Sequence, residues 1–419
     1  MSSLAITGIG RLVTYEPDRD DRTDASLVCE DGRVVWVGDG TPPEQAGDEH
    51  IDAAGRCVVP GFVDSHTHLV FAGDRLAEFT ARLTGQVYSA GGIATTVGAT
   101  RATGGPALEA RARHLAAEAL RGGTTTLEVK SGYGLSVEDE RRLLEVAGRV
   151  TTETTFLGAH VVPPEFAHDA DGYVDLVCGP MLDACAPLAA WCDVFCEDGA
   201  FDADQSRAVL TAGAARGLGL RVHANQLAPG PGVRLGVELG AASVDHCTFL
   251  DSGDIEALAG TGTVATLLPA VELSTGSPAA PGRRLLDAGV HVALASDCNP
   301  GTSYTTSMAL VIALACRHYR MTPAEALRAA TLGGARALRR DDVGHLRIGA
   351  RADMVMLDAP DPGYIAYRPG VPLVHRVIRG GALTGGCDAG PLTSPPSTSM
   401  CDSDRPRGGR STGPPGTPP

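Results

Sequence analysis

Short apolar runs alternate with longer amphipathic stretches between about residue 58 and residue 343. The runs predict eight strands, with the sequences CVVPGFVD, TTTLEV, TTFLGAHV, CDVFCE, LRVHAN, SVDHCTF, TVATLLP and VHVALASD. Between them, stretches such as ALEARARHLAAEALRGG, SVEDERRLLEVAGRV and DADQSRAVLTAGAARG repeat apolar residues at helical spacing. Because strands separated by helices favour a parallel barrel, we predict an α/β fold built on a (β/α)8, TIM-like barrel.

The two flanks of this region have β-character without helices. Residues 1–57 contain the runs LAITGIGRLVTY, SLVCEDGRVVWVG and HIDAAGRCVV, with Asp31-Gly32 as a turn inside the second. Residues 344–384 return to short β-like runs and are expected to complete the sheet begun at the N-terminus. Residues 385–419 are rich in Pro, Gly, Ser and Thr, which predicts a disordered tail because such a composition buries no core.

Composition narrows the possible partners and compartments. The net charge is −15, which argues against a nucleic-acid partner because phosphates are repelled. No apolar run approaches the roughly 18 residues of a membrane span, and the start MSSLAITGIGRLV does not resemble a signal peptide. The eleven cysteines show no paired CxxC spacing, which indicates reduced thiols. We therefore predict a cytoplasmic protein with neither a membrane nor a nucleic-acid partner.

Five of the twelve histidines fall at the ends of predicted strands. His66 and His68 follow the first strand on one face, and the third, fifth, sixth and eighth strands end at His160, His223, His246 and Asp297. The carboxyl ends of barrel strands meet at one face, where active sites form. Taken singly, an HxH pair or a polar residue at a strand end is usually an exposed surface residue or has only a structural role. Their joint placement favours a site for zinc or ferrous iron.

Several motifs resemble a known enzyme family. VVPGFVDSHTHL resembles the first-strand signature of the amidohydrolase superfamily, whose barrel carries a small β-sandwich domain built from both chain ends. The stretches FAGDR, EVKSGYGL, GAHVVPPEF, VHANQLA, DHCTFL, ASDCNPGT and MTPAEALRAATLGGARAL resemble, in the same order, the imidazolonepropionase family within it. The resemblance covers about residues 55–360. It implies a hydrolase of carbon–nitrogen bonds in cyclic amides that opens 4-imidazolone-5-propanoate to N-formimidoyl-L-glutamate in histidine degradation.

The resemblance also implies a metal centre and two catalytic residues. One Zn2+ or iron ion (Fe2+ or Fe3+) is expected on four ligands, His66, His68, His223 and Asp297. Asp297 is further expected to accept the proton of the attacking water and deliver it to the leaving nitrogen, although SDCNPG also fits a helix N-cap. His246 is expected to polarise the carbonyl or orient the water. Lys130 lies at the second strand, where no bridging lysine is sought, so no second metal is expected.

Substrate contacts implied by the resemblance surround this centre. Arg75 is the expected anchor of the propionate, because a guanidinium pairs with a carboxylate through two hydrogen bonds. The other expected contacts are Tyr133, His160, Gln226, Asn299, Gly301 and Thr302. Some relatives carry glutamate at the position of Gln226, where it has been proposed as the base, but an amide accepts no proton and can only bind. The family further implies a homodimer.

Two alternatives stay open at this point. The first is a mononuclear-metal hydrolytic deaminase of a purine, pyrimidine or related ring. It is disfavoured by Gln226, where deaminases usually carry glutamate, and by Arg75, which has no evident use with a neutral base. The second is a scaffold protein without activity, which is disfavoured because the full set of ligand residues is present.

Overall fold

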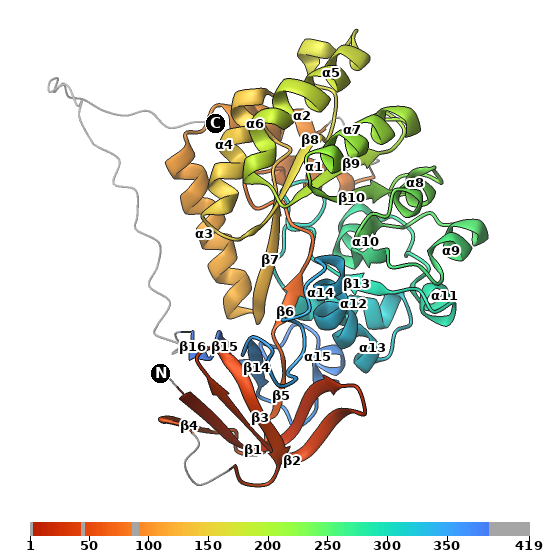
Figure 1. The fold of residues 1–419 in the computed structure, drawn as a ribbon. Coiled ribbons are helices and arrows are strands. Elements are labelled where there is room, and N and C mark those ends of the chain that lie inside the picture. The colour runs from red at the N-terminus through yellow and green to blue at the C-terminus, as the bar shows by residue number, and fades with distance from the viewer. Residues whose placement is uncertain (1–2, 43–46, 86–91, 385–419) are drawn as a thin grey trace, which may run out of the picture. The chain divides into compact units, whose positions relative to one another are not determined.

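An eight-stranded parallel sheet forms the barrel (Figure 1). The computed structural model describes residues 3–42, 47–85 and 92–384. Within these ranges the sheet runs in chain order from β6 to β13. Its strands are β6 (Phe62–Asp64), β7 (Thr124–Lys130), β8 (Glu153–Ala159), β9 (Trp191–Cys196), β10 (Gly219–Ala224), β11 (Ser243–His246), β12 (Val264–Leu267) and β13 (Val292–Leu294). All eight coincide with predicted runs, and the predicted fold class is confirmed.

The barrel is closed by the segments that follow its first and last strands. The Asp297 backbone N–H donates to the His66 carbonyl at 3.0 Å, and the His68 N–H donates to the Cys298 carbonyl at 3.0 Å. Thr67 and Cys298 form an isolated parallel bridge between the same segments. The backbone that closes the barrel therefore carries three of the four predicted metal ligands.

Helices cover the outside of the barrel strands (Figure 1). The three amphipathic stretches quoted in the sequence analysis form α3 (Gly105–Arg121), α4 (Val137–Gly148) and α7 (Ala203–Ala215), so all three predicted helices are confirmed. The others are α1 (Leu76–Leu83), α2 (Ile93–Arg101), α5 (Ala170–Leu176), α6 (Leu182–Cys185), α8 (Gly232–Glu238), α9 (Ser252–Leu258), α10 (Pro269–Thr275), α11 (Gly282–Asp287), α12 (Met308–His318), α13 (Pro323–Arg328) and α14 (Gly334–Ala337).

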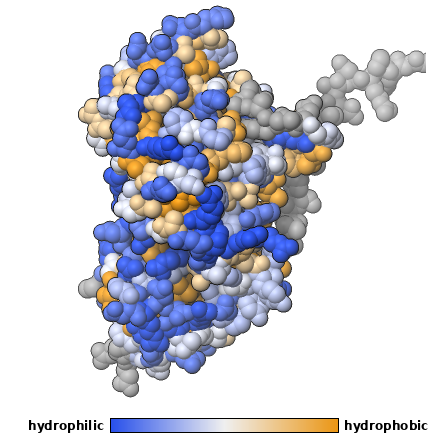
Figure 2. All heavy atoms as spheres, turned by 90° about the vertical axis from the view of Figure 1, so that its right-hand side faces the viewer, coloured by the Kyte–Doolittle hydropathy of each residue, from blue (hydrophilic) through white to orange (hydrophobic). Residues whose placement is uncertain are grey.

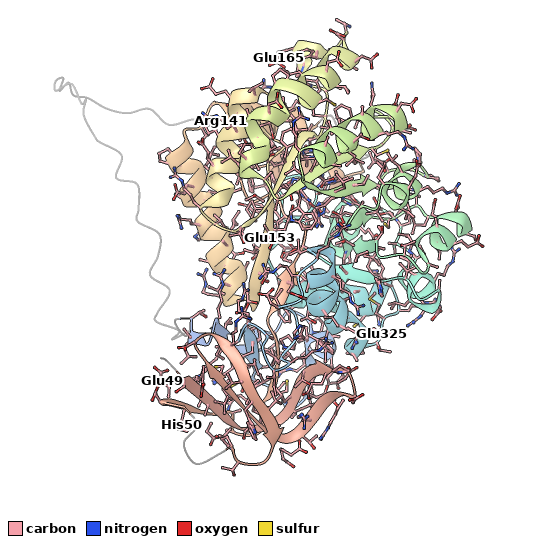
Figure 3. The ribbon with its side chains drawn as sticks, in the orientation of Figure 1. Glu49, His50, Arg141, Glu153, Glu165 and Glu325 are labelled. Atoms are coloured by element: carbon pink, nitrogen blue, oxygen red, sulfur yellow. The ribbon has the colours of Figure 1, made fainter. Side chains whose placement is uncertain are left out.

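Local sequence signals explain where several helices begin. The Ser136 side chain accepts the Asp139 N–H at the start of α4, and this helix buries Leu143 and Leu144 against the barrel. At α13, Thr322 and Glu325 (labelled in Figure 3) form a reciprocal capping box. Such caps satisfy backbone N–H groups that have no partner inside the helix.

The run predicted as the first barrel strand is two strands that belong to different sheets. β5 (Cys57–Pro60) pairs with strands of a second, mixed sheet that is described below, whereas β6 pairs with β7. The break falls at Gly61, whose N–H donates to the Asp353 carbonyl at 2.9 Å. A Cβ atom at Gly61 would lie 2.2 Å from Thr125 Oγ1, so only glycine allows this close approach. A continuous apolar run carries no mark of such a change of sheet.

Strands from both chain ends form a second, mixed sheet. Its order is β16-β15-β14-β5-β1-β2-β3, and β4 pairs with β1 in parallel. The members besides β5 are β1 (Ser3–Glu16), β2 (Arg19–Glu30), β3 (Arg33–Asp39), β4 (Glu49–Asp52), β14 (Met354–Leu357), β15 (Val374–Arg379) and β16 (Ala382–Leu383), with α15 (Tyr364–Tyr367) between β14 and β15. Its own core joins Ile6 and Leu27 to Met354 and Ile378. Residues near the two ends therefore complete one core, as the β-character of both flanks predicts.

Other expectations concern the surface, the thiols and the tail. Every cysteine in the described ranges has a free thiol, and most are buried, as predicted. None of the helices in those ranges combines the length and apolarity that crossing a membrane requires. Hydrophilic and hydrophobic residues are interspersed on the face shown in Figure 2. The predicted disordered tail lies outside the described residues, and the proposed division at residues 57, 343 and 384 stays a prediction.

Candidate active site

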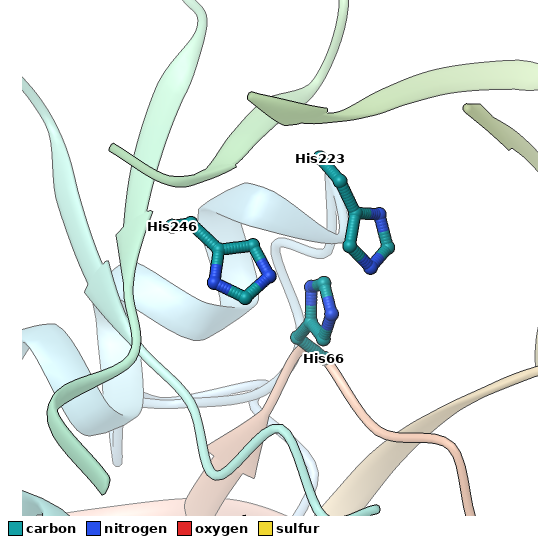
Figure 4. A group of neighbouring side chains, drawn as sticks. All are labelled: His66, His223 and His246. Carbon is teal, nitrogen blue, oxygen red and sulfur yellow. The ribbon is translucent and has the colours of Figure 1, made fainter. Parts of the chain in front are cut away.

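Four histidines and an aspartate meet at the carboxyl ends of the barrel strands. His66 and His68 follow β6, His223 lies in β10, His246 ends β11, and Asp297 follows β13. The imidazoles of His66, His223 and His246 face one another in Figure 4. Asp297 Oδ1 lies 3.5 Å from His66 Nε2 and 3.3 Å from His68 Nε2, and His68 Nε2 lies 3.4 Å from His223 Nε2. The structure thus brings together all the residues predicted for the centre.

The donor atoms of this cluster fit a metal ion. Among the described residues, two groups place their ligand atoms within 4.8 Å of one another, His66–His68–Asp297 and His66–His223–His246. His66 Nε2 and Asp297 Oδ1 are buried and lack a hydrogen-bond partner. Leaving such polar atoms unpaired is costly, and a cation between them would satisfy both. Three or four nitrogen and carboxylate donors at this spacing suit zinc or iron.

Two aspartates that the sequence analysis missed orient the histidines. Asp245 Oδ2 lies 2.7 Å from His66 Nδ1, and Asp193 Oδ2 lies 3.0 Å from His223 Nδ1. A carboxylate at Nδ1 accepts a hydrogen bond from the Nδ1–H and leaves Nε2 free to bind a metal. Both aspartates interrupt apolar strand runs, CDVFC and SVDHC, and a charged residue inside a buried strand was the available signal.

The protonation of the cluster follows from its burial. Burial lowers the pKa of His66 and His68 well below the ordinary value, and it lowers that of His246 to about 3. Burial likewise raises the pKa of Asp297, although the nearby imidazoles of His246 and His223 oppose this shift. The imidazoles of His66, His68 and His246 are therefore neutral at pH 7, which is the form that binds a metal or donates a single N–H.

Arg75 lies where the predicted carboxylate anchor should lie, at the edge of the cavity above the cluster. Its side chain is nearly buried and already engages Glu78, through Nε at 2.7 Å and through a terminal nitrogen at 2.5 Å. The guanidinium passes between Gly92 and Gly301, where added Cβ atoms would lie 2.1 and 2.2 Å from its nitrogens. Glu78 and the two glycines were not predicted, and only the fold reveals their role in holding Arg75.

The aromatic contacts predicted for the substrate line the same cavity. The His160 ring stacks on that of His68 with centroids 5.3 Å apart, and its Nδ1 lies 2.9 Å from the Gly132 carbonyl. Tyr133 is buried, with its ring 5.4 Å from His160 and 5.8 Å from His68. Both rings therefore border the space next to the proposed metal ligands.

The remaining predicted contacts divide between the cavity and the loop beneath it. Gln226 lines the cavity, and its backbone N–H donates to Glu197, a residue that the sequence analysis did not single out. Asn299 and Thr302 also line it. The Asn299 carboxamide is already engaged, since it accepts the N–H groups of Gly301 and Thr302 at 2.8 Å. Gly301 itself borders an adjacent, more apolar groove rather than this cavity.

Comparison with known proteins places this site in a family. Models of the amidohydrolase family match residues 49–157 and 236–385. The imidazolonepropionase of Mycolicibacterium smegmatis is 62% identical over 388 residues, which cover 91% of this chain and 98% of that one. That of Saccharopolyspora erythraea is 62% identical over 390 residues, covering 92% and 100%. The chain belongs to the imidazolonepropionase family. The predicted family and hydrolase class are confirmed.

Solved structures of other amidohydrolases share the fold of this imidazolonepropionase-family chain. A triazine hydrolase from Arthobacter aurescens has a TM-score of 0.73 at 20% identity, covering 91% of this chain and 94% of that one. A guanine deaminase from C. acetobutylicum has a TM-score of 0.67 at 15% identity, covering 91% and 99%. At such low identity the likeness concerns the fold alone. The deaminase alternative thus gains only a distant likeness, whereas the two imidazolonepropionases match at 62% identity.

Proposed function

We propose that this chain hydrolyses 4-imidazolone-5-propanoate to N-formimidoyl-L-glutamate, a step of histidine degradation. The observation that carries the proposal is the buried cluster of His66, His68, His223 and Asp297 in a chain that matches imidazolonepropionases over nearly their whole length. Incubation of the purified chain with this substrate tests it. The expected product is heavier by one water, and no ammonia is released, whereas a deaminase releases ammonia.

His66, His68, His223 and Asp297 would hold one Zn2+ or iron ion, and their donor types do not distinguish the two metals. When bound, the ion supplies Lewis acidity, which lowers the pKa of a water molecule towards neutrality. The two unpartnered atoms, His66 Nε2 and Asp297 Oδ1, support this assignment. His246 also lies within ligand distance of the cluster, and we assign it to the substrate side because a four-residue set is complete without it.

Asp297 and His246 divide the work on the reacting amide. The Asp297 carboxylate accepts the proton of the attacking water and passes it to the ring nitrogen as the carbon–nitrogen bond breaks. His246 stays neutral, because burial holds its pKa at about 3, and it donates an N–H to the carbonyl oxygen where negative charge develops. Asp297 and His246 both have positive φ angles (49° and 79°), which direct these side chains from their strand ends.

The substrate's propionate is proposed to bind Arg75, with Tyr133, His160 and Gln226 against the ring. Glu78 occupies one edge of the guanidinium, so the propionate meets the terminal nitrogen that faces Gly301 and Asn299. Glu78 thereby fixes the orientation of the Arg75 guanidinium towards the propionate. Gln226 serves for binding only, because a carboxamide takes no proton at neutral pH.

We expect Arg75→Ala to lower kcat/KM by about 10- to 150-fold, since a hydrogen bond between charged groups is worth about 1.5–3 kcal/mol and 1.4 kcal/mol is tenfold. Arg75→Lys should recover only part of the loss, because an ammonium does not hold Glu78 and the propionate in two fixed directions as a guanidinium does. Steady-state kinetics check both variants. A ring amide without the propionate should react equally slowly with wild type and Arg75→Ala. Unchanged kcat/KM in Arg75→Ala would assign the carboxylate to another residue.

Removal of the metal is expected to destabilise the folded chain. A ligand that binds only the native state at 1,000 times its Kd adds about 4 kcal/mol to the free energy of unfolding. Thermal unfolding with and without a chelator should therefore show a lower Tm after chelation, restored by added Zn2+. The variant Asp297→Asn should show a much smaller difference. An identical Tm for chelated and Zn2+-loaded wild type would contradict a site within the core.

We further propose that the chain lies in the cytoplasm and forms a homodimer. Its main binding partner is then the small-molecule substrate. Buried free thiols and the family resemblance support this assignment. Light scattering of the purified chain gives the oligomeric state directly.

A further inference from the structure

Five charged side chains lie fully buried beneath the proposed metal ligands. This charged layer consists of Glu128 and Lys130 on β7, Asp193 on β9, Arg221 on β10 and Asp245 on β11, and each side chain is 0% exposed. Formal charges of three carboxylates and two cations give the layer a net charge of −1. Charges in a core are costly, and each one here is paired.

Lys130 joins two halves of the ligand set. Its ammonium lies 2.9 Å from Glu128 Oε1 and 2.8 Å from Asp193 Oδ2. Glu128 Oε2 accepts the backbone N–H of Thr67 at 3.0 Å, and Thr67 stands between His66 and His68. Asp193 in turn contacts His223 Nδ1. One ammonium thus connects the backbone of the HxH segment with the imidazole of the third histidine.

Arg221 makes the corresponding connection to His66. Its terminal nitrogen donates to Asp245 Oδ2 at 3.2 Å and to the Ser65 carbonyl at 2.7 Å. Asp245 Oδ2 also contacts His66 Nδ1. Each cation therefore touches one carboxylate that holds an imidazole. Each cation is also tied to the backbone at the HxH stretch, Arg221 through the carbonyl of Ser65 just before His66 and Lys130 through Glu128 and the N–H of Thr67.

Barrel stability alone does not explain this layer. Buried ion pairs are often no more stabilising than apolar residues of the same volume. An apolar side chain cannot accept a hydrogen bond from an imidazole N–H. Asp193 and Asp245 accept one from His223 and His66, and they do so most strongly while they remain ionised and fixed in direction.

We propose that Lys130 and Arg221 are positioning residues that act through Asp193 and Asp245. They hold each carboxylate against an imidazole Nδ1–H, which fixes His223 and His66 in the tautomer that presents Nε2 to the metal. The inference rests on the proposed function only for the identity of these two histidines as metal ligands. Its consequence is measured as metal affinity, with no substrate present.

The decisive variants remove the charge that holds the tautomer, with little change in volume. Oδ2 of Asp193 faces both Lys130 and His223, and Oδ2 of Asp245 faces both Arg221 and His66. In Asp193→Asn and Asp245→Asn a neutral carboxamide takes this place, so the imidazole Nδ1–H meets a weaker acceptor and the Nε2–H tautomer, which cannot bind a metal, becomes accessible. Lys130→Met removes the ammonium, and Lys130→Arg restores a cation. Asp353→Asn is the matched control, because Asp353 is also buried and paired with Arg351 but lies just before β14 of the mixed sheet.

The test is a competition titration of the full metal-free chain with Zn2+ against a chelator, together with visible spectra after Co2+ loading. Asp193→Asn, Asp245→Asn and Lys130→Met should raise the Zn2+ Kd by about 10- to 100-fold and change the Co2+ spectrum. Lys130→Arg should recover part of the affinity, and Asp353→Asn should keep it. If Lys130→Met does not fold, the two Asn variants decide.

A Zn2+ Kd within twofold of wild type in both Asn variants would overturn the inference, as would an equal loss in Asp353→Asn. Failure of the proposed function has a different signature. A wild type that binds Zn2+ tightly, loses affinity in these variants and yet leaves 4-imidazolone-5-propanoate intact would overturn the proposed substrate and support the charged layer's role.

Discussion

Asp297→Asn is expected to lower kcat by on the order of 10⁴-fold, the largest effect of any single change in the site. The substitution removes the proposed proton carrier, and general acid–base catalysis contributes up to about 10⁴-fold. Asn keeps nearly the same size and can still accept hydrogen bonds, but it takes no proton. The amide is also a weaker metal ligand than a carboxylate, so metal content must be measured beside the rate of a single turnover at saturating metal.

The control for Asp297→Asn is again Asp353→Asn, which neutralises a buried carboxylate just before β14 of the mixed sheet. That variant should lose thermal stability while keeping its turnover rate. If metal-saturated Asp297→Asn turned over within tenfold of wild type, another group would carry the proton. Glu197, a buried carboxylate that accepts the backbone N–H of Gln226, would then be a candidate to examine.

His246→Ala is expected to lower kcat by about 10²- to 10³-fold while the metal content stays near that of wild type. Loss of one donor to a developing oxyanion typically has this effect. His246→Gln should recover part of the rate, because its carboxamide also donates an N–H. Elemental analysis and steady-state kinetics on the same preparation give both quantities.

His345→Ala is the matched control, since His345 is also buried but bonds the Asp341 carbonyl outside the barrel mouth. It should leave turnover unchanged. A parallel loss of metal and activity in His246→Ala would make His246 a ligand. The grouping of His66, His223 and His246 would then be the metal site in place of the set that contains His68.

The positions of the site residues along the chain could be predicted because a barrel turns strand ends into spatial neighbours. His66, His223, His246 and Asp297 each follow or end an apolar run, and the fold needs no further information to bring them together. This reasoning from strand ends does not locate Arg75 and Tyr133. Their place at the cavity was predicted only from the resemblance to a family. Loop residues carry no periodic pattern that fixes their direction.

Contacts between distant elements could not be predicted in this way. The contact of Asp193 with His223 depends on which side chains of β9 and β10 face each other inside the barrel. Asp193 and Lys130 read as single polar residues within apolar runs, and their pairing appears only when β7 and β9 are placed around β8. Likewise, the change of sheet at Gly61 depends on the approach of Thr125, which lies 64 residues later.

The central claim is that this chain opens its substrate with one metal ion held by His66, His68, His223 and Asp297. The most direct test is to titrate the metal-free chain with Zn2+ and to follow the conversion of 4-imidazolone-5-propanoate to N-formimidoyl-L-glutamate. Activity should be absent at the start, rise in proportion to added Zn2+, and reach a plateau at one equivalent per chain. Full activity of the metal-free chain, or a plateau only at two equivalents, would contradict the claim.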